Sequence, residues 1–382
     1  MNLKHFSTFL LITFIILLFT SCNIVEKSRI EKYNNSFFKH NKKTLITLFK
    51  INFRNSIFNN KENIETARPL LLNDEIVLVG GRKNFYKVNY QKGFIVYKKK
   101  LDFSIFGNIN LVEKGKIIFY ASDGNIYLTD TELNTVFWKY HLTDESVIGD
   151  YRFINDSIIF KTSKDRIYSL NKNTSELNWV TKSYLSDYMP LNTETEIIIN
   201  KERIFAGFSN GKISIFENKT GMTLYEDSIT TEDSFNDITA SVTIKNGTAF
   251  IPSYRKGIVA INIKTKTKNW SSKLSAISKL FIFGDIGYYF SADEMIKISI
   301  DTGKILKKYK LNIVNPNNYF LFKDKYIVIS SKDTGIYMID IRNLDNSSKI
   351  GVSSGVSIKP ILKDDKLIIL TNNSTLYVLK IK

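Results

Sequence analysis

The sequence is poor in cysteine, histidine and proline, and each shortage excludes a class of protein. Cys22 is the only Cys among 382 residues, so the chain cannot form an internal disulfide, a Cys-based zinc site or an iron–sulfur cluster. The three histidines, His5, His40 and His141, are too few for metal or triad chemistry that relies on several imidazoles. With only 5 Pro and 18 Gly, the chain is not fibrous or linker-like.

Basic residues are in excess, with 54 Lys and Arg against 37 Asp and Glu and a formal net charge of +17. Nine of them are Arg and 45 are Lys, spread along the chain. Because base readout and phosphate clamping favour the forked contacts of Arg, we expect a solvated basic surface and no nucleic-acid partner. Anionic membrane lipids are the alternative use of this charge. The 43% hydrophobic residues exclude global disorder, and the length indicates two ordinary domains or one large symmetric body.

The first 22 residues have the features of an export signal. Lys4 precedes an apolar run from Phe6 to Phe19, which is too short to span a bilayer, and small residues follow it. Cys22 comes directly after Thr20-Ser21, which resembles the lipobox of bacterial lipoproteins, with Phe19 where that family usually has Leu. In that family the signal is cut before the Cys, which is then acylated with groups such as palmitate. The alternative is a plain secretory peptide with an incidental Cys.

These features divide the chain into three predicted parts: a lipoprotein signal peptide at 1–21, a lipidated tether at 22–43 and a folded body at 44–382. The tether is polar and charged and lacks sustained periodicity. More than one acyl chain anchors a protein stably, because each buried methylene contributes about 0.8 kcal/mol. Asn23 stands where Asp usually retains such lipoproteins in the inner membrane. The resemblance therefore implies lipid anchoring at the outer membrane, on its periplasmic face.

A repeat of about 41 residues dominates the rest of the chain. Its most regular part is an apolar segment whose second residue falls at positions 86, 127, 168, 214, 259, 296, 337 and 377, and the residue before it is apolar in all eight copies. Each of the three tryptophans lies 11 residues after the second residue of its own segment, and a Tyr fills this position in two other copies. The residues concerned are Trp138, Trp179, Trp270, Tyr97 and Tyr225.

The composition of the repeat favours strands. A turn separates each segment from its aromatic residue and carries Gly93, Gly221, Gly303 or Asn134, residue types that accept positive φ, so the chain can reverse there. The segments are short, β-branched and aromatic, unlike helical repeats of similar length. About 41 residues per four strands is typical of a propeller blade. The predicted fold is all-β, an eight-bladed β-propeller of four-stranded antiparallel blades, with each outer aromatic packed against the adjoining blade.

Closure of this ring requires a strand from elsewhere in the chain. The eighth copy would need its outer aromatic near position 388, which lies beyond Lys382. An open blade edge promotes aggregation. The strand-like run 44–51 precedes the first copy, so we predict that it pairs with the last blade as an N-terminal closing strand.

The repeat resembles a known family. The pattern apolar-Tyr-x-Leu-Asp-x-x-Thr-Gly-x-x-x-Trp is typical of the pyrroloquinoline-quinone-like propeller repeat, and this chain matches it in spacing from Ile258 to Trp270 and in the turn Lys219-Thr220-Gly221. With the export signal, Cys22 and eight copies, the whole chain resembles the BamB-type outer-membrane assembly lipoproteins. The resemblance implies a non-catalytic scaffold subunit of the β-barrel assembly machine. Its implied partner is the barrel-forming subunit, with no cofactor, metal or small-molecule substrate.

The resemblance also implies partner contacts in two segments. In that family a Leu-x-Leu-Arg-Gly segment between the third and fourth copies and an Asp-Val-Asp segment between the fourth and fifth contact the periplasmic domains of the barrel-forming subunit. This chain has Tyr188-Met189-Pro190-Leu191-Asn192 and Asp237-Ile238-Thr239 there, without the Arg and with one acid of two. Met189, Leu191 and Asp237 are the implied contact residues. Alternatively, Leu191 begins a buried strand and Asp237 is a turn residue.

An enzyme is the main alternative function, because the same repeat occurs in quinoprotein dehydrogenases. Those enzymes resemble one another in adjacent cysteines under the cofactor, calcium ligands and a catalytic Asp, and Cys22 cannot supply that disulfide. Asp150, Asp237 and Asp301 are candidate bases, but none has a paired acid at a suitable spacing. We expect each in a turn or at the surface and predict no catalytic residue. A periplasmic propeller that binds a ligand in its central channel is a further alternative.

Overall fold

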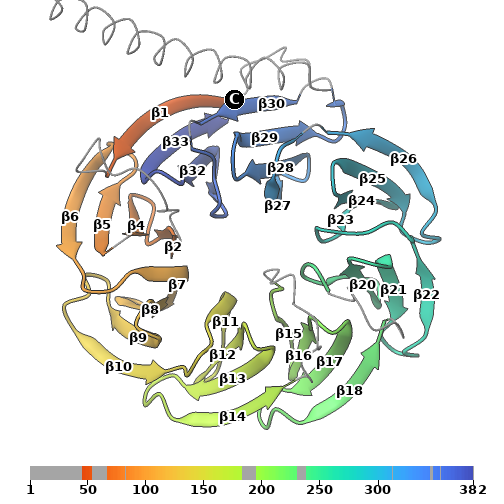
Figure 1. The fold of residues 1–382 in the computed structure, drawn as a ribbon, viewed down its shortest axis with the longest axis horizontal. Coiled ribbons are helices and arrows are strands. Elements are labelled where there is room, and N and C mark those ends of the chain that lie inside the picture. Colours follow the sequence, from red (N-terminus) through yellow and green to blue (C-terminus); the bar gives the residue numbers. More distant parts are fainter. Residues whose placement is uncertain are drawn as a thin grey trace, which may run out of the picture.

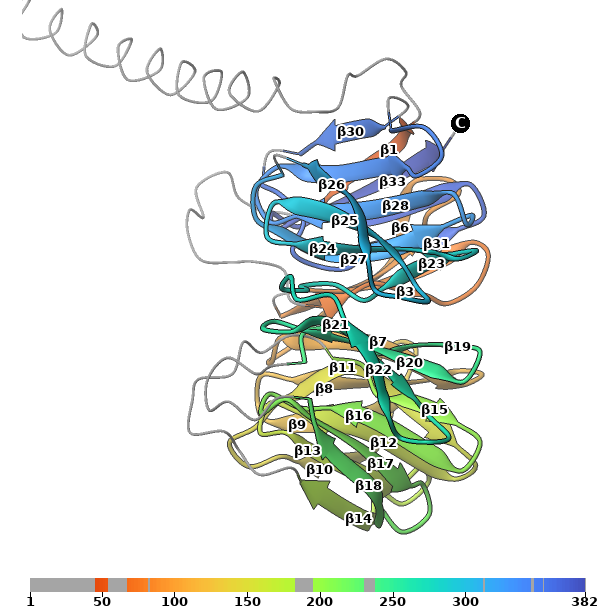
Figure 2. The same ribbon diagram turned by 90° about the vertical axis from the view of Figure 1, so that its right-hand side faces the viewer.

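The computed structural model describes residues 45–53, 67–81, 83–182, 195–229, 238–311, 313–344, 347–352 and 354–381. In these ranges the chain forms 33 β-strands in eight sheets, arranged as blades around a central axis (Figure 1). Seven sheets have four strands and one has a fifth short strand. Figure 2 shows the same ring from its edge. The predicted eight-bladed propeller is confirmed. No helix within the described ranges is long and apolar enough to cross a membrane.

The strands follow one another from the axis to the rim in each blade, and the blades are numbered in chain order. Blades 1 and 2 consist of β3 (Leu70–Leu71), β4 (Ile76–Gly81), β5 (Asn84–Asn89) and β6 (Phe94–Lys100), then β7 (Ile105–Glu113), β8 (Lys116–Ala121), β9 (Asn125–Asp130) and β10 (Val136–His141). Blades 3 and 4 consist of β11 (Val147–Ile154), β12 (Ser157–Thr162), β13 (Arg166–Asn171) and β14 (Leu177–Lys182), then β15 (Ile198–Asn200), β16 (Arg203–Gly207), β17 (Lys212–Glu217) and β18 (Thr223–Ser228).

The second half of the ring continues this order. Blades 5 and 6 consist of β19 (Thr243–Lys245), β20 (Thr248–Ser253), β21 (Gly257–Asn262) and β22 (Lys268–Ser271), then β23 (Phe281–Phe283), β24 (Ile286–Ser291), β25 (Glu294–Ser299) and β26 (Ile305–Lys310). Blades 7 and 8 consist of β27 (Pro316–Phe322), β28 (Tyr326–Ser331), β29 (Gly335–Asp340) and β30 (Ser348–Gly351), then β31 (Ile361–Lys363), β32 (Lys366–Leu370), β33 (Thr375–Ile381) and β1 (Leu45–Asn52).

The apolar segments of the sequence repeat are the third strands of the blades, from β5 to β33. Each of these strands is covered on both faces, because a neighbouring blade packs on either side. The buried apolar side chains form eight clusters, and each cluster draws on two adjacent blades. The cluster between blades 8 and 1, for example, combines Val378 with Val88. The core is therefore a set of eight blade interfaces.

The three tryptophans lie on the fourth strands and pack against the next blade, as predicted. Trp138 and Trp179 are buried, with 8% and 9% of their surfaces exposed. Each indole N–H crosses the blade interface, and its acceptor is the carbonyl directly after the third strand of the next blade. The acceptors are Lys172, Asn218 and Ile300, at 2.9, 3.1 and 3.1 Å. Each indole therefore joins apolar burial to one hydrogen bond between blades.

The turns before the fourth strands follow the prediction in three blades and depart from it in one. Gly93, Gly221 and Gly303 have φ of 77°, 69° and 70°. In blade 2 the left-handed residue is Leu133, with φ 58°, and the prediction for Asn134 was wrong. The reason is Asp130, whose carboxylate accepts the backbone N–H groups of Glu132, Asn134 and Thr135 and so wraps the turn around itself. Leu133 then points into the core.

The N-terminal strand closes the ring. β1 pairs antiparallel with β33, from Leu45 opposite Ile381 to Asn52 opposite Thr375, and Figure 1 shows the two strands side by side. The predicted closing strand is therefore confirmed. It makes the eighth blade four-stranded and removes the open edge of β33.

Strand β1 also reproduces a bulge that recurs around the ring. In seven blades the pairing of the third and fourth strands shifts by one residue. On the fourth strand, the residue directly after this bulge has a fixed partner on the third strand, namely the third residue of the repeat segment. In blade 2, for example, Trp138 pairs with Leu128. In blade 8 this residue is Phe49, opposite Val378. Phe49 therefore stands in the tryptophan position, and its ring lies on Gly93 of blade 1.

The innermost part of blade 1 is divided between two sheets. β2 (Ala67–Arg68) pairs in parallel with β7 of blade 2, whereas β3 pairs with β4. Pro69 separates the two short strands, and proline has no N–H to donate to a ladder. The register places Arg68 beside Asn108. This break brings a cationic side chain of blade 1 to the inner strand of blade 2, at the wall of the central channel.

Candidate functional site

The predicted site residues Cys22, Met189, Leu191 and Asp237 all lie outside the described residues. The ends of the two predicted contact segments are described. Residues 183–194 connect β14 to β15, and residues 230–237 connect the region of β18 to that of β19. Because strand direction alternates within each blade, both connections start and finish at the same face of the ring. They belong to consecutive blades.

The roots of these two segments meet at Gly207 and Phe208, at the end of β16. Thr195 directly follows the first segment, and its hydroxyl accepts a hydrogen bond from the Lys161 ammonium at 2.8 Å. The same ammonium donates to the Gly207 carbonyl at 2.7 Å. Ile238 directly follows the second segment, and its N–H donates to the Phe208 carbonyl at 3.3 Å. One two-residue stretch of blade 4 therefore holds the ends of both predicted contact segments.

Ile238 and Thr239 fix the second root in the interior. Ile238 is 1% exposed, and its side chain covers Gly207 so closely that a Cβ there would lie 2.6 Å from Ile238 Cγ2. The Thr239 hydroxyl is buried and donates to the Ala276 carbonyl at 2.6 Å. The buried Ala276 carbonyl therefore needs a donor at this position, which the threonine hydroxyl supplies and a carboxylate would not.

A buried ion pair stabilises the first root. The Lys161 and Asp165 side chains are 4% and 7% exposed, and Lys161 Nζ lies 3.0 Å from Asp165 Oδ1. The ammonium has three N–H donors, and Asp165, Thr195 and Gly207 supply three acceptors. Asp165 in turn accepts the Ser209 N–H at 3.0 Å and the Ser209 hydroxyl. This network joins blades 3 and 4 at Thr195, the first described residue after the segment that contains Met189 and Leu191.

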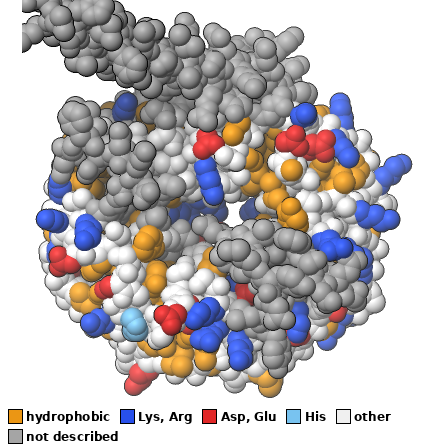
Figure 3. Space-filling view, in the orientation of Figure 1, with side chains coloured by type: hydrophobic (Ala, Val, Ile, Leu, Met, Phe, Trp, Pro, Cys, Tyr) orange, Lys and Arg blue, Asp and Glu red, His pale blue; other side chains and the backbone are white. Residues whose placement is uncertain are grey.

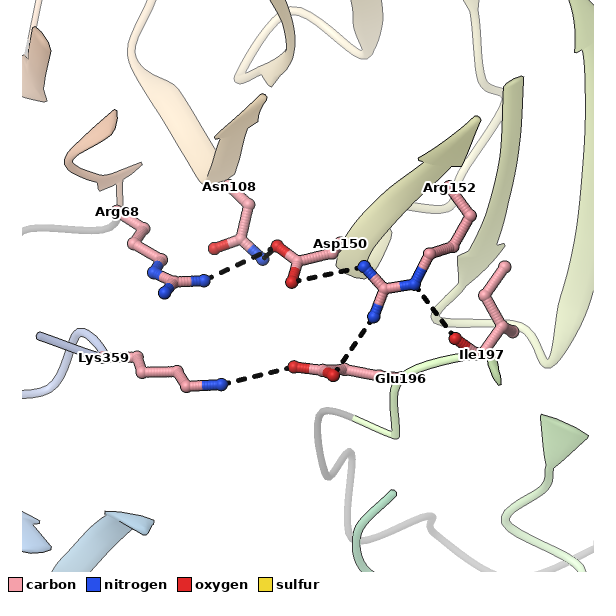
Figure 4. Close-up of polar contacts among 7 residues, drawn as sticks. All are labelled: Arg68, Asn108, Asp150, Arg152, Glu196, Ile197 and Lys359. Atoms are coloured by element: carbon pink, nitrogen blue, oxygen red, sulfur yellow. Dashed lines mark hydrogen bonds and ion pairs between the residues drawn. The ribbon is translucent and has the colours of Figure 1, made fainter. Parts of the chain in front are cut away.

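A second polar cluster lies at the wall of the central channel (Figure 4). Asp150 on β11 accepts a hydrogen bond from Asn108 Nδ2 at 2.6 Å and pairs with Arg68 and Arg152 at 3.7 and 3.5 Å. Figure 3 shows the opening of the channel at the centre of this face, with Lys or Arg side chains at its edge. The inner strands of blades 1 to 3 are thereby linked through one carboxylate.

The cluster continues across the channel through Glu196. Its Oε2 lies 3.1 Å from Arg152 Nη2, and its Oε1 lies 3.4 Å from Lys359 Nζ. Arg152 also donates from Nε to the Ile197 carbonyl at 3.1 Å. Glu196 precedes β15 in blade 4 and Lys359 precedes β31 in blade 8. Blades four apart in a ring of eight face each other, so this ion pair crosses the axis.

Two pKa shifts describe the electrostatics of the channel. Burial raises the pKa of Glu196, but Lys359 and Arg152 oppose this effect, and the pKa lies below its ordinary value. Burial lowers the pKa of Lys279, and Lys359 lowers it further against the opposing charge of Glu196. The channel therefore favours the ionised carboxylate of Glu196, whereas the ammonium of Lys279 is destabilised.

The candidate bases occupy different environments. Asp301 lies in an exposed turn after β25, as predicted. Asp150 does not, because its side chain is 15% exposed and bonded to Asn108 and two arginines. The expectation of a turn or surface position was wrong for Asp150, since β11 turns this residue toward the channel. In the described part of the chain, no group of three or more His, Cys, Asp or Glu side chains is arranged to hold a metal ion.

The channel cluster was not predicted, although the sequence contains a signal for it. Four charged members stand 18 residues before the second residue of their repeat segments, on or next to the first strand of the blade. They are Arg68, Asp150, Glu196 and Lys359. A charge at one fixed place of several repeats marks a shared environment. The channel is that environment, because first strands line the axis.

Comparison with known sequences assigns the family. A family described as outer membrane protein assembly factor BamB matches residues 100–309, more than half of the chain. The chain belongs to the BamB family. Outer membrane protein assembly factor BamB of Legionella pneumophila (strain Paris) is 22% identical over 207 residues, which cover 50% of this chain and 52% of that protein. The match thus spans about half the length of this relative.

Solved structures share the fold. The crystal structure of BamB from Moraxella catarrhalis aligns with a TM-score of 0.72 at 14% identity, over 88% of this chain and 99% of that one. A europium-containing methanol dehydrogenase aligns with a TM-score of 0.62 at 11% identity, over 91% and 87%. At these identities the likeness shows the fold alone. Membership of the BamB family therefore rests on the sequence match, since an enzyme and an assembly factor share this architecture.

Proposed function

We propose that this chain is a non-catalytic scaffold subunit of the outer-membrane β-barrel assembly machine and binds the periplasmic domains of the barrel-forming subunit. The observation that carries the proposal is the common root of its two contact segments at Gly207 and Phe208. Residues 183–194 and 230–237 both end at this place, where Thr195 and Ile238 follow them, and in this proposal they supply Met189, Leu191 and Asp237 to one partner surface. Membership of the BamB family supports this role.

The ring supplies the rigidity that a scaffold needs. Every blade packs on two neighbours through an apolar cluster, and β1 closes the circle. A closed ring cannot open at one blade without breaking two interfaces. Thr195 and Ile238, at the ends of the two segments, therefore keep their spacing while a multidomain partner moves, and little conformational entropy is lost at the ring when the partner binds.

Lipid anchoring completes the proposed arrangement. In this proposal the signal peptide at 1–21 is removed, Cys22 is acylated and residues 22–43 connect the lipid to the ring. The described body begins with β1, on the rim of blade 8. A chain of this length reaches at most about 80 Å. Confining scaffold and partner to one membrane surface raises their effective concentration without any additional contact.

The experiment is recovery of the barrel-forming subunit from solubilised membranes with tagged full-length protein. We expect the double variant Leu191→Glu and Asp237→Lys to weaken recovery roughly tenfold or more, because it removes an apolar anchor and reverses a charge. The matched control is Leu306→Glu with Asp301→Lys, which makes the same changes at exposed residues of blade 6. Equal recovery with both double variants would place the contact elsewhere on the ring.

The same preparation separates scaffold from enzyme. The scaffold role predicts that the barrel-forming subunit copurifies and that no quinone-dependent dye reduction occurs when pyrroloquinoline quinone and calcium are added. Dye reduction abolished by Asp150→Asn would instead identify an enzyme that uses the channel carboxylate. The pull-down and the dye assay use one sample, so a failed purification cannot imitate either result.

A further inference from the structure

Among the described residues, the polar cluster of the central channel holds more positive than negative charge. The cluster contains four cationic side chains and two carboxylates, which leaves an excess of two positive charges. The members are Arg68, Arg152, Lys279 and Lys359, with Asp150 and Glu196. Like charges inside a protein ring repel one another at a lower dielectric constant than in bulk water. Such an excess is unfavourable in the empty channel and favourable for an anion.

Lys279 is the cation of this cluster that has no ion-pair partner among the described residues. It precedes β23 in blade 6, midway around the ring between Glu196 in blade 4 and Lys359 in blade 8. Its ammonium lies 5.7 Å from the centroid of the Phe281 ring. Burial and the charge of Lys359 lower its pKa. A partly desolvated ammonium beside a second ammonium is the electrostatic environment of an anion site.

We propose that the channel binds a doubly charged tetrahedral oxyanion, a phosphate or a phosphomonoester, between Lys279 and Lys359. Two negative charges equal the excess of the cluster. The cations approach the axis from blades 1, 3, 6 and 8, and a tetrahedral group directs oxygens toward several sides at once. A carboxylate is planar, carries one charge and addresses one side. Arg152 adds a guanidinium, whose forked donors suit phosphate oxygens.

Glu196 acts as the competitor of the ligand. In the structure its carboxylate accepts the contacts of both Lys359 and Arg152, the groups that a phosphate would use. Binding therefore requires Lys359 to leave Glu196 or to share its donors. It follows that Glu196 weakens binding, so its neutral isostere is expected to increase affinity. A residue with a purely structural role would not give this result.

The test is isothermal titration of purified full-length protein with sodium phosphate at pH 7.5, with ionic strength held constant by sodium chloride. We expect saturable 1:1 binding, a loss of affinity of tenfold or more in Lys279→Gln, and a severalfold gain in Glu196→Gln. Lys308→Gln, at an exposed position of β26 on the rim, is the matched control and should change affinity less than twofold. Sulfate should compete with phosphate, and succinate should not.

The identity of the phosphate carrier is a separate arm of the same titration. Glycerol 3-phosphate that binds more tightly than inorganic phosphate assigns the site to an ester, and equal affinity assigns it to free phosphate. Absence of saturable heat in the unmodified protein overturns the proposal. So does an equal loss of affinity in Lys279→Gln and Lys308→Gln, because binding would then follow surface charge.

Discussion

The contact between Phe49 and Gly93 gives the sharpest test of how the ring is closed. Phe49 is the one aromatic of β1 that rests on blade 1, and a Cβ built on Gly93 would lie 2.5 Å from Phe49 Cδ1. An aromatic side chain buries about 150–250 Å², and Phe49 is partly buried, so Phe49→Ala removes roughly 100 Å² of apolar contact. At about 25 cal/mol per Å², its cost is about 2.5 kcal/mol.

Gly93→Ala combines two costs that can be separated. Its φ of 77° costs an L residue about 1–2 kcal/mol, and overlap with the Phe49 ring adds about 1–3 kcal/mol. In the Phe49→Ala background the ring is absent and only the backbone cost is left. The double variant is therefore expected to lose about 1–3 kcal/mol less than the sum of the single variants.

The assay is urea unfolding followed by tryptophan fluorescence for the four members of this cycle. Gly247→Ala is the control for the backbone cost, because Gly247 has φ 74° and a Cβ added there would have no neighbour within 4 Å. Leu48→Ala, at the adjacent bulge where 38% of the side chain is exposed, should cost less than about 1 kcal/mol. Additivity within about 0.5 kcal/mol in the Phe49 and Gly93 cycle would refute the inference that this ring seals the last interface.

Two further predictions concern buried polar contacts. Lys161→Met leaves the Asp165 carboxylate without its cation and should destabilise the protein by about 3–5 kcal/mol. It should also accelerate hydrogen exchange at the Ile238 amide. Lys139→Met at the exposed rim should do neither, and unchanged exchange in Lys161→Met would show that Lys161 does not stabilise the root at Ile238. Burial and Asp123 raise the pKa of Tyr127 to about 12. Because this pKa is above that of the unfolded chain, about 10, the stabilisation by Tyr127 is present below pH 10 and lost as pH rises to 12. Urea unfolding should show the advantage over Tyr127→Phe disappearing in this window, and a constant advantage would contradict the shift.

The fold could be predicted because the blade interfaces impose the same requirement eight times. Each third strand needs apolar residues on both faces, and six of the eight fourth strands carry an aromatic at one position, so Trp138, Trp179 and Trp270 recur at one spacing. The closing strand followed from the missing end of the eighth copy. Its aromatic did not, because β1 is out of sequence order and only its register with β33 reveals Phe49 as the equivalent residue.

Other features depended on pairings that only the closed ring creates. Glu196 and Lys359 are 163 positions apart and meet because opposite blades face each other. Of the partners of Asp150, only Arg152 is close in sequence. Asn108 comes from blade 2, and Arg68 reaches Asp150 through the break at Pro69. In the turn of blade 2, the residue with positive φ is Leu133 and not Asn134, because three backbone N–H groups donate to the Asp130 carboxylate. Spacing predicts repeated environments well and individual polar partners poorly.

The excess charge of the channel links stability to ligand binding. At neutral pH an ammonium whose folded pKa is lowered destabilises the folded state, because the unfolded chain solvates that charge fully. Neutralising Lys279 should therefore stabilise the ring in the absence of phosphate while it weakens phosphate binding by tenfold or more. A purely structural lysine would give the opposite sign, since its removal leaves a packing defect and no relief of repulsion. Opposite changes in stability and affinity in Lys279→Gln would thus distinguish a retained binding group from a tolerated surface charge.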